Sequence, residues 1–145
     1  MSWVAGLDPG RSKCGLVLVA IDAEEVLAGH VLAPEAVLPL LKQWQQEGDL
    51  TTVVLGDGTG SVDWVRPLQQ LVPVQLVNEH GTTLRARRRF WDLWPPRGWR
   101  RLLPDGMRLP PTELDAIAAL VMVEDHCKIR CRWPGPAPLR IGHGR

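Results

Sequence analysis

The first part of the chain contains three short apolar runs that follow one another almost without interruption. They are WVAGLD (residues 3–8), CGLVLVAID (residues 14–22) and EVLAGHVL (residues 25–32). Gly10 lies in the first break and Ala23 begins the second, and both breaks are short enough for tight turns. The pattern predicts three antiparallel strands that lie side by side.

After these runs the pattern changes to alternating helices and strands. Two more strands and four helices are expected, the strands at residues 51–56 and 73–79 and the helices at residues 34–48, 61–71, 83–93 and 112–126. Pro67 interrupts the second helix, and Thr112 is expected to be the N-cap of the last one. We therefore predict an α/β fold with a mixed five-stranded sheet, three antiparallel strands plus two parallel ones, flanked by helices on both faces.

The chain has 145 residues, enough for one domain with a buried core. We expect residues 1–127 to form this domain. Residues 128–145 are basic and rich in proline and glycine, which predicts a disordered tail. Residues 94–111 form a Trp- and Arg-rich loop that is long for a compact domain, and such loops are usually functional or mobile.

Charge is distributed unevenly along the chain. Residues 1–72 carry four Lys and Arg against nine Asp and Glu, whereas residues 73–145 carry thirteen against seven. The basic second half favours a polyanionic partner. Three cysteines do not indicate a disulfide framework, no signal-peptide pattern opens the chain, and its apolar runs are too short to cross a bilayer. These features predict a cytoplasmic protein with no membrane partner.

Acidic residues follow the strands that are expected to be parallel. Asp8 ends the first strand, Asp57 and Glu79 follow the two later ones, and Asp115 lies near the start of the last helix. Because the carboxyl ends of parallel strands meet at one edge of a sheet, these acids are expected to converge. With no lysine placed to neutralise each one, they would repel one another unless a divalent cation lies among them. This chemistry indicates phosphodiester cleavage with Mg²⁺ or Mn²⁺.

Three motifs together resemble a known family. GLDPGRSKCGLVLV (residues 6–19) resembles the opening strand, Asp-x-Gly turn and second strand of the YqgF/RuvC branch of the ribonuclease H-like superfamily. VNEHGTTLRAR (residues 77–87) and LDAIAALVMVE (residues 114–124) are similar to the later motifs of that branch. The resemblance covers residues 4–124 in consistent order and spacing, which is more specific than any one motif.

The resemblance implies a ribonuclease H-like fold and a divalent-metal nuclease. It places the catalytic metal ligands at Asp8, Glu79 and Asp115, with Mg²⁺ or Mn²⁺ as cofactor. Family members are linked to maturation of the 16S rRNA precursor and, more loosely, to Holliday-junction resolution. Asn78 and His80 depart from the family's usual Asp and Arg. His80 is also a candidate proton carrier by its adjacency to Glu79.

Structural interpretations of the acids remain open alongside the catalytic one. Asp8 could open an Asx turn at a strand end. Asp115, three residues after Thr112, could be the acid of a capping box. Asp57, between two glycines, could be a turn residue or a fourth metal ligand.

Basic side chains and aromatic rings are concentrated after Glu79. The residues expected to contact nucleic acid are Arg11, Lys13, Thr82, Thr83, Arg85, Arg87, Arg88, Arg89, Arg97, Arg100 and Arg101. Arginine binds phosphates and aromatic faces stack on unpaired bases, and Phe90, Trp91, Trp94 and Trp99 lie in the same stretch. The alternative is a solvated Arg-rich helix face with Trp91 and Trp94 packed inward.

The function expected from these observations is a metal-dependent endonuclease acting on structured RNA, above all an rRNA precursor, or on branched DNA. A non-catalytic RNA-binding relative and an actin-like ATPase or sugar kinase are the alternatives. The kinase class needs two such domains to enclose a nucleotide, and one copy of the motif in 145 residues argues against it. The sequence leaves the oligomeric state open, with a homodimer among the alternatives.

Overall fold

A computed structural model describes residues 2–58, 60–78, 81–104, 107–110 and 113–138 of the chain. The strands are β1 (Ser2–Asp8), β2 (Cys14–Ala20), β3 (Glu25–Leu32), β4 (Asp49–Gly56) and β5 (Val74–Val77). The α-helices are α1 (Val37–Glu47), α2 (Ser61–Gln69), α3 (Thr82–Leu93) and α4 (Asp115–Cys127). Two short 3₁₀ helices, η1 (Pro34–Ala36) and η2 (Gly98–Leu102), complete the described elements.

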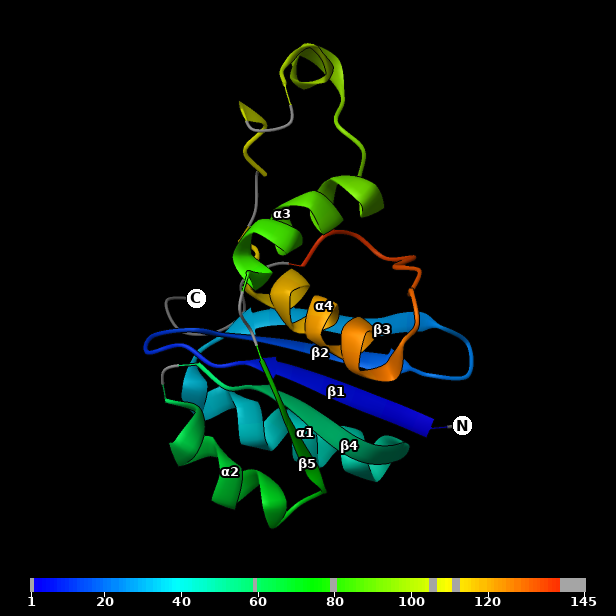
Figure 1. Cartoon of the computed structure of the whole chain (residues 1–145). Coiled ribbons are helices and arrows are strands. Elements are labelled where there is room, and N and C mark those ends of the chain that lie inside the picture. The colour runs from blue at the N-terminus through cyan, green and yellow to red at the C-terminus, as the bar shows by residue number, and fades with distance from the viewer. Residues whose placement is uncertain (1, 59, 79–80, 105–106, 111–112, 139–145) are drawn as a thin grey trace.

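The strands form one mixed sheet in the order β3-β2-β1-β4-β5. β1 pairs antiparallel with β2 and β2 antiparallel with β3, while β4 lies parallel to both β1 and β5. This confirms the predicted sheet of three antiparallel strands plus two parallel ones. The carboxyl ends of β1, β4 and β5 consequently lie at the same edge of the sheet, as Figure 1 shows.

Alternating residues of the strands build two separate cores. On one face, Leu7 of β1 packs in a cluster with Leu41 and Trp44 of α1 and with Leu68 of α2. On the other face, Val4 packs in a cluster with residues of α4. Because side chains alternate across a strand, this period-two pattern places helices on both faces, in agreement with the prediction.

Helix α4 lies between the sheet and α3 (Figure 1). Its residues from Ala116 to Glu124 are all buried, because one side faces the strands and the other faces Ala86 and Phe90 of α3. The α4 backbone approaches the sheet closely at Gly6, where a Cβ would lie 2.7 Å from the carbonyl oxygen of Ala119. Helix α3 therefore forms an outer layer.

Two helices differ in detail from their expected form. Helix α2 forms with Pro67 inside it. Helix α4 begins at Asp115 with Leu114 as its N-cap, later than expected, and Thr112 lies outside the described residues. Asp115 is thus the first residue of its helix, so it is not the N3 acid of a capping box.

The described residues 94–104 and 107–110, which we call the Trp/Arg loop, extend away from the body of the domain beyond α3 (Figure 1). Arg108 organises the loop, since its guanidinium donates to the carbonyl oxygens of Arg100 at 3.0 Å and Arg101 at 3.1 Å. The indole nitrogen of Trp91 donates to the carbonyl of Arg108 at 3.2 Å. The bond from Trp91 connects the loop to the end of α3.

The described part of the tail, residues 128–138, packs along β3. The amide of Val26 donates to the carbonyl of Arg132, and the amide of Arg132 donates to the carbonyl of Glu24, both at 2.8 Å. Cys131 is buried, and the ring of Trp133 lies against Gly29. This differs from the disordered tail expected for residues 128–138, because apolar side chains within the basic segment meet the outer edge of β3. Residues 139–145 lie outside the described residues.

Among the described helices, none has the length and apolar character needed to span a bilayer.

Candidate active site

Two carboxylates meet at the edge where the parallel strands end. Asp8 is the last residue of β1 and Asp115 is the first residue of α4, although 107 positions separate them in the sequence. Both line a small pocket of about 90 Å³, together with Thr83 and Ala86 of α3. The structure thus brings one sequence-predicted acid from a strand and one from a helix to a common site.

Gly15 accounts for this proximity. It pairs with Asp8 across the β1–β2 ladder, and a Cβ built on it would overlap the backbone carbonyl of Asp115. Only glycine leaves space for the first turn of α4 to rest on the hairpin at this point. Gly15 is the glycine that follows the Asp-x-Gly turn in the opening motif, so the motif supplies both the acid and the space for its partner.

Lys13 enters the site from the β1–β2 turn. Its Nζ lies 2.8 Å from Oε1 of Glu113 and 3.5 Å from Oδ2 of Asp115. The hydrogen bond to Glu113 is the main cause that raises the pKa of Lys13 above its usual range, and the charge of Asp115 adds to it. The expectation that no lysine neutralises these acids is therefore wrong for Asp115. Lys13 and Glu113 are far apart in sequence, and no local pattern identified their pairing.

Of the other predicted acids, Asp57 lies within the described residues, at the end of the neighbouring strand. Asp57 follows β4, is exposed, and its amide donates to the carbonyl of Val77 at the end of β5 at 2.9 Å. Glu79 and His80, which come shortly after β5, lie outside the described residues. Within the residues that the structure describes, no three His, Cys, Asp or Glu side chains are grouped to hold a metal.

The donor chemistry of the pocket is suited to a hard divalent cation. Asp8 and Asp115 offer carboxylate oxygens, which are the ligands that Mg²⁺ and Mn²⁺ prefer. Thr83 adds a hydroxyl at the rim of the same pocket. Two carboxylates and a hydroxyl fit such a cation, and Glu79 as a further ligand stays a prediction.

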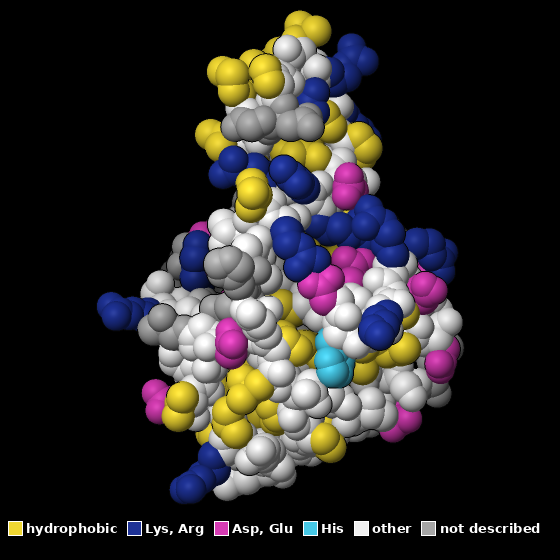
Figure 2. Space-filling model, in the orientation of Figure 1, with side chains coloured by type: hydrophobic (Ala, Val, Ile, Leu, Met, Phe, Trp, Pro, Cys, Tyr) yellow, Lys and Arg dark blue, Asp and Glu magenta, His cyan; other side chains and the backbone are white. Residues whose placement is uncertain are grey.

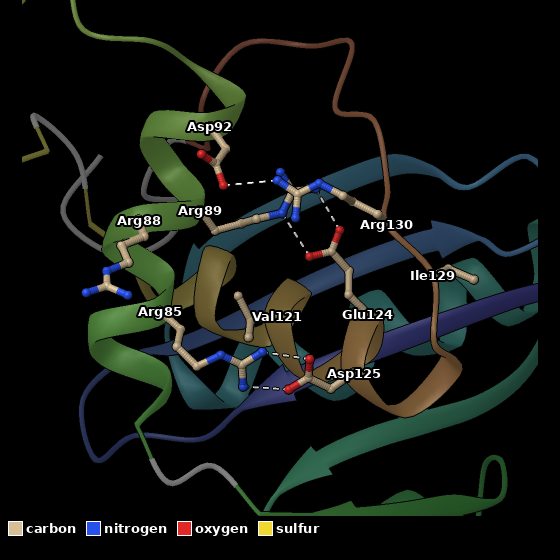
Figure 3. A pocket seen from close by; sticks show the side chains of 9 residues that line it. All are labelled: Arg85, Arg88, Arg89, Asp92, Val121, Glu124, Asp125, Ile129 and Arg130. Carbon is tan, nitrogen blue, oxygen red and sulfur yellow. Dashed lines mark hydrogen bonds and ion pairs between the residues drawn. The ribbon is translucent and has the colours of Figure 1, made fainter.

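Two of the predicted phosphate-binding arginines are held by acids of α4 (Figure 3). Arg89 is buried and forms two hydrogen bonds with the carboxylate of Glu124, at 2.9 and 2.7 Å. It also donates to the carbonyl of Cys131 at 2.7 Å, and Glu124 accepts from the Cys131 amide at 2.7 Å. Arg89 therefore ties α3, α4 and the segment after α4 together, and its guanidinium faces the interior.

Arg85 is exposed but also paired. Its guanidinium contacts both carboxylate oxygens of Asp125, at 2.6 and 2.7 Å. Nearby, Arg130 donates to Asp92 at 3.0 Å. Arg88 forms no ion pair with the described side chains, and in Figure 3 it points away from these acids.

Other predicted basic residues remain on the surface. Arg11 is exposed in the β1–β2 turn, and Arg97 and Arg101 are exposed in the Trp/Arg loop. The guanidinium of Arg100 lies 5.2 Å from the centre of the Trp99 ring, a cation–π arrangement. Figure 2 shows basic side chains gathered near α3 and on the loop above it, interspersed with apolar side chains.

Comparisons with known proteins support the fold. No protein-family model and no curated protein matches the sequence. Among solved structures, RuvC of Thermus thermophilus matches at 20% identity over 83% of this chain and 89% of that chain, with a TM-score of 0.50. T. thermophilus RuvC in complex with Holliday junction substrate matches at 19% identity over 84% and 90% of the two chains, with a TM-score of 0.49. A ROK family protein from Streptococcus pneumoniae in complex with sucrose matches at 19% identity over 58% and 37%, with a TM-score of 0.40. The chain has a RuvC-like fold of the ribonuclease H-like type.

Proposed function

We propose that this chain is a divalent-metal-dependent endonuclease that cleaves phosphodiester bonds in structured nucleic acid. The observation that carries the proposal is the shared pocket of Asp8 and Asp115 at the edge where β1, β4 and β5 end. In a fold of this kind, ligands bind at the carboxyl ends of the parallel strands. Two carboxylates at that edge suit metal-assisted hydrolysis better than a purely structural role.

In the proposed site, Asp8, Asp115 and Glu79 hold Mg²⁺ or Mn²⁺, and Asp57 is a candidate fourth ligand. A metal held there would supply an activated water molecule and would stabilise the leaving oxygen of the phosphodiester. Lys13 orients the Asp115 carboxylate through their ion pair and reduces its repulsion with Glu113.

The basic residues outside the pocket bind the substrate in this proposal. Arg11 in the β1–β2 turn and Arg88 on α3 are exposed, and in this proposal both contact phosphates. Thr82 and Thr83 begin α3, and Thr83 at the pocket rim contacts the phosphate next to the cut bond. His80 stays a candidate for proton transfer to the leaving oxygen.

The substrate class follows from the resemblance to the YqgF/RuvC branch, which connects this site to maturation of the 16S rRNA precursor. Four-way DNA junctions are the second substrate to test, because the same resemblance links the family to junction resolution. A protein that binds these molecules without cutting them would instead be a non-catalytic RNA-binding relative.

Cleavage of end-labelled precursor fragments and four-way junctions tests the proposal. We expect the wild type to cut with Mn²⁺ or Mg²⁺ and to lose this activity when a chelator is added. Asp8→Asn and Asp115→Asn should cut at least about a hundredfold more slowly, since each substitution removes a metal ligand. Asp49→Asn is the matched control, because Asp49 is exposed at the opposite end of β4. Equal cutting by Asp8→Asn and the wild type, or no cutting of either substrate, would refute the assignment.

A further inference from the structure

Helix α3 presents two faces of different chemistry. One face carries Arg85 and Arg89, which are bound by acids of α4. The other carries Thr83, Arg87 and Trp91, spaced four residues apart, so these side chains lie in one row along the helix. Thr83 begins this row at the carboxylate pocket.

The far end of the row opens into an aromatic cleft, defined by Phe90, Trp91, Trp94, Arg97 and Arg100. The cleft has a volume of about 430 Å³, which is within the range of sites that bind small organic groups. It belongs to the base of the Trp/Arg loop and is separate from the carboxylate pocket.

The aromatic walls of the cleft are fixed by packing. Phe90 is buried, and its ring centre lies 4.9 Å from that of Trp91 and 5.2 Å from that of Trp94. Trp94 also packs edge-on against Trp133 at 5.2 Å, and the Trp91 indole is hydrogen-bonded to the Arg108 carbonyl. The two tryptophans are nevertheless only partly buried, so a preformed aromatic surface remains accessible.

The charge of the cleft selects an anionic aromatic ligand. Arg97 and Arg100 line it, and its described lining residues include no acidic side chain. Arg87 lies between the two pockets, and among the described residues its side chain has no ion pair. Aromatic faces beside guanidinium groups match a nucleobase with its flanking phosphates.

The distance between the pockets suits a short single strand. Thr83 and Trp94 are 11 positions apart, which corresponds to about 16 Å along a helix axis. A stacked strand advances about 3.4 Å per nucleotide, so the row covers roughly five nucleotides.

We infer that this row binds a single-stranded segment of the substrate, with Arg87 on its backbone and one unpaired base held in the aromatic cleft. The inference rests on the proposed function for the identity of the substrate. It assigns the Trp/Arg loop a positioning role: the loop selects an unpaired base about five nucleotides from the cut bond.

Fluorescence of 2-aminopurine tests the inference, because this base loses its emission when it stacks. A single-stranded 12-mer with one 2-aminopurine is titrated with protein in chelator, so that no cleavage occurs. We expect the wild type to quench the fluorescence. Trp94→Leu should bind the strand about tenfold more weakly and should not quench it. Arg97→Ala should show a smaller salt dependence of its binding affinity. Trp99→Leu, in the same loop but not among the described residues that line the cleft, is expected to keep the quenching.

Controls separate folding and function from base binding. Arg66→Ala on α2, exposed like Arg97, should bind as the wild type does. Circular dichroism reports whether Trp94→Leu folds. If this variant does not fold, the affinities of Arg87→Ala and Arg97→Ala for the single strand test the inference instead. Wild-type affinity in both variants would overturn it. Equal affinity for a fully paired duplex, or loss of quenching with Trp99→Leu instead of Trp94→Leu, would also overturn it.

The outcomes distinguish this inference from the proposed function. If the protein quenches 2-aminopurine through Trp94 but cuts no substrate, base binding in the cleft is supported and the nuclease proposal is refuted. If the protein cuts, and the cleft variants bind and cut like the wild type, the nuclease proposal is supported and base binding in the cleft is refuted.

Discussion

Gly15 lies directly against the backbone carbonyl of Asp115, with no space for a side chain between strand and helix. Because Gly15 is also the ladder partner of Asp8, one close contact brings the backbones of Asp8 and Asp115 near each other. The acid pair therefore depends on a residue that contributes no chemistry of its own.

Substitution of Gly15 by alanine should lower the stability of the domain. The added methyl must displace the first turn of α4, and such overpacking costs about 1–3 kcal/mol. Urea denaturation measures the change, and metal-dependent cleavage should fall with it because Asp115 moves. Gly135→Ala is the control, since a Cβ there has nothing within 4 Å, and a similar loss in both variants would contradict the argument.

The buried pair of Arg89 and Glu124 should matter far more for stability than the exposed pair of Arg85 and Asp125. Glu124→Gln leaves a buried guanidinium without its counter-charge, a change that costs about 3–5 kcal/mol. Asp125→Asn at the exposed pair should cost under about 1 kcal/mol. Chemical denaturation of the two variants side by side tests this, and equal losses would disprove the distinction.

Removal of the Lys13 charge should strengthen metal binding at the proposed site. Lys13 competes with a cation for the Asp115 carboxylate, and its ion pairs are partly exposed, which limits the effect to roughly two- to fivefold in affinity. Calorimetric titration of Lys13→Met with Mn²⁺ measures this. Lys42→Met, at an exposed position on α1, should bind as the wild type does, and weaker binding by Lys13→Met would contradict the prediction.

Stability should fall at alkaline pH through Cys131. Burial raises the pKa of this thiol from 9.0 to about 12, and the charge of Glu124 contributes to the shift. Since the unfolded chain then ionises first, the stabilising contribution is complete below pH 9 and is lost as pH rises towards 12. By pH 10 the loss should be about 1 kcal/mol.

Urea denaturation at pH 8 and pH 10 measures this effect. Cys131→Ala should lose less stability than the wild type between the two pH values, because alanine has no proton to release. Cys14→Ala serves as a comparison, since burial also raises the pKa of that thiol. An identical pH dependence in the wild type and Cys131→Ala would disprove the role of Cys131.

The site was predictable where local sequence carries the information. Asp8 ends one strand and Asp57 directly follows another, and the apolar pattern and turns of both strands are visible in the sequence. Parallel pairing of these strands then places the two residues at one edge of the sheet. The predicted start of α4 was less accurate, since the helix begins at Asp115 and not at Thr112. That prediction used only the N-cap chemistry of Thr112. It did not include the packing of the first turn of α4 against Gly15.

The sequence by itself determined the order of strands and helices, because residue periodicity and turn chemistry act over a few neighbouring residues. Only the tertiary structure decided which charges pair. Arg88 and Arg89 are adjacent and chemically identical, yet one is exposed and the other is buried against Glu124. Lys13 likewise meets Asp115 across the fold. Pairing depends on burial and on helix orientation, and both arise from contacts between segments that are distant in sequence.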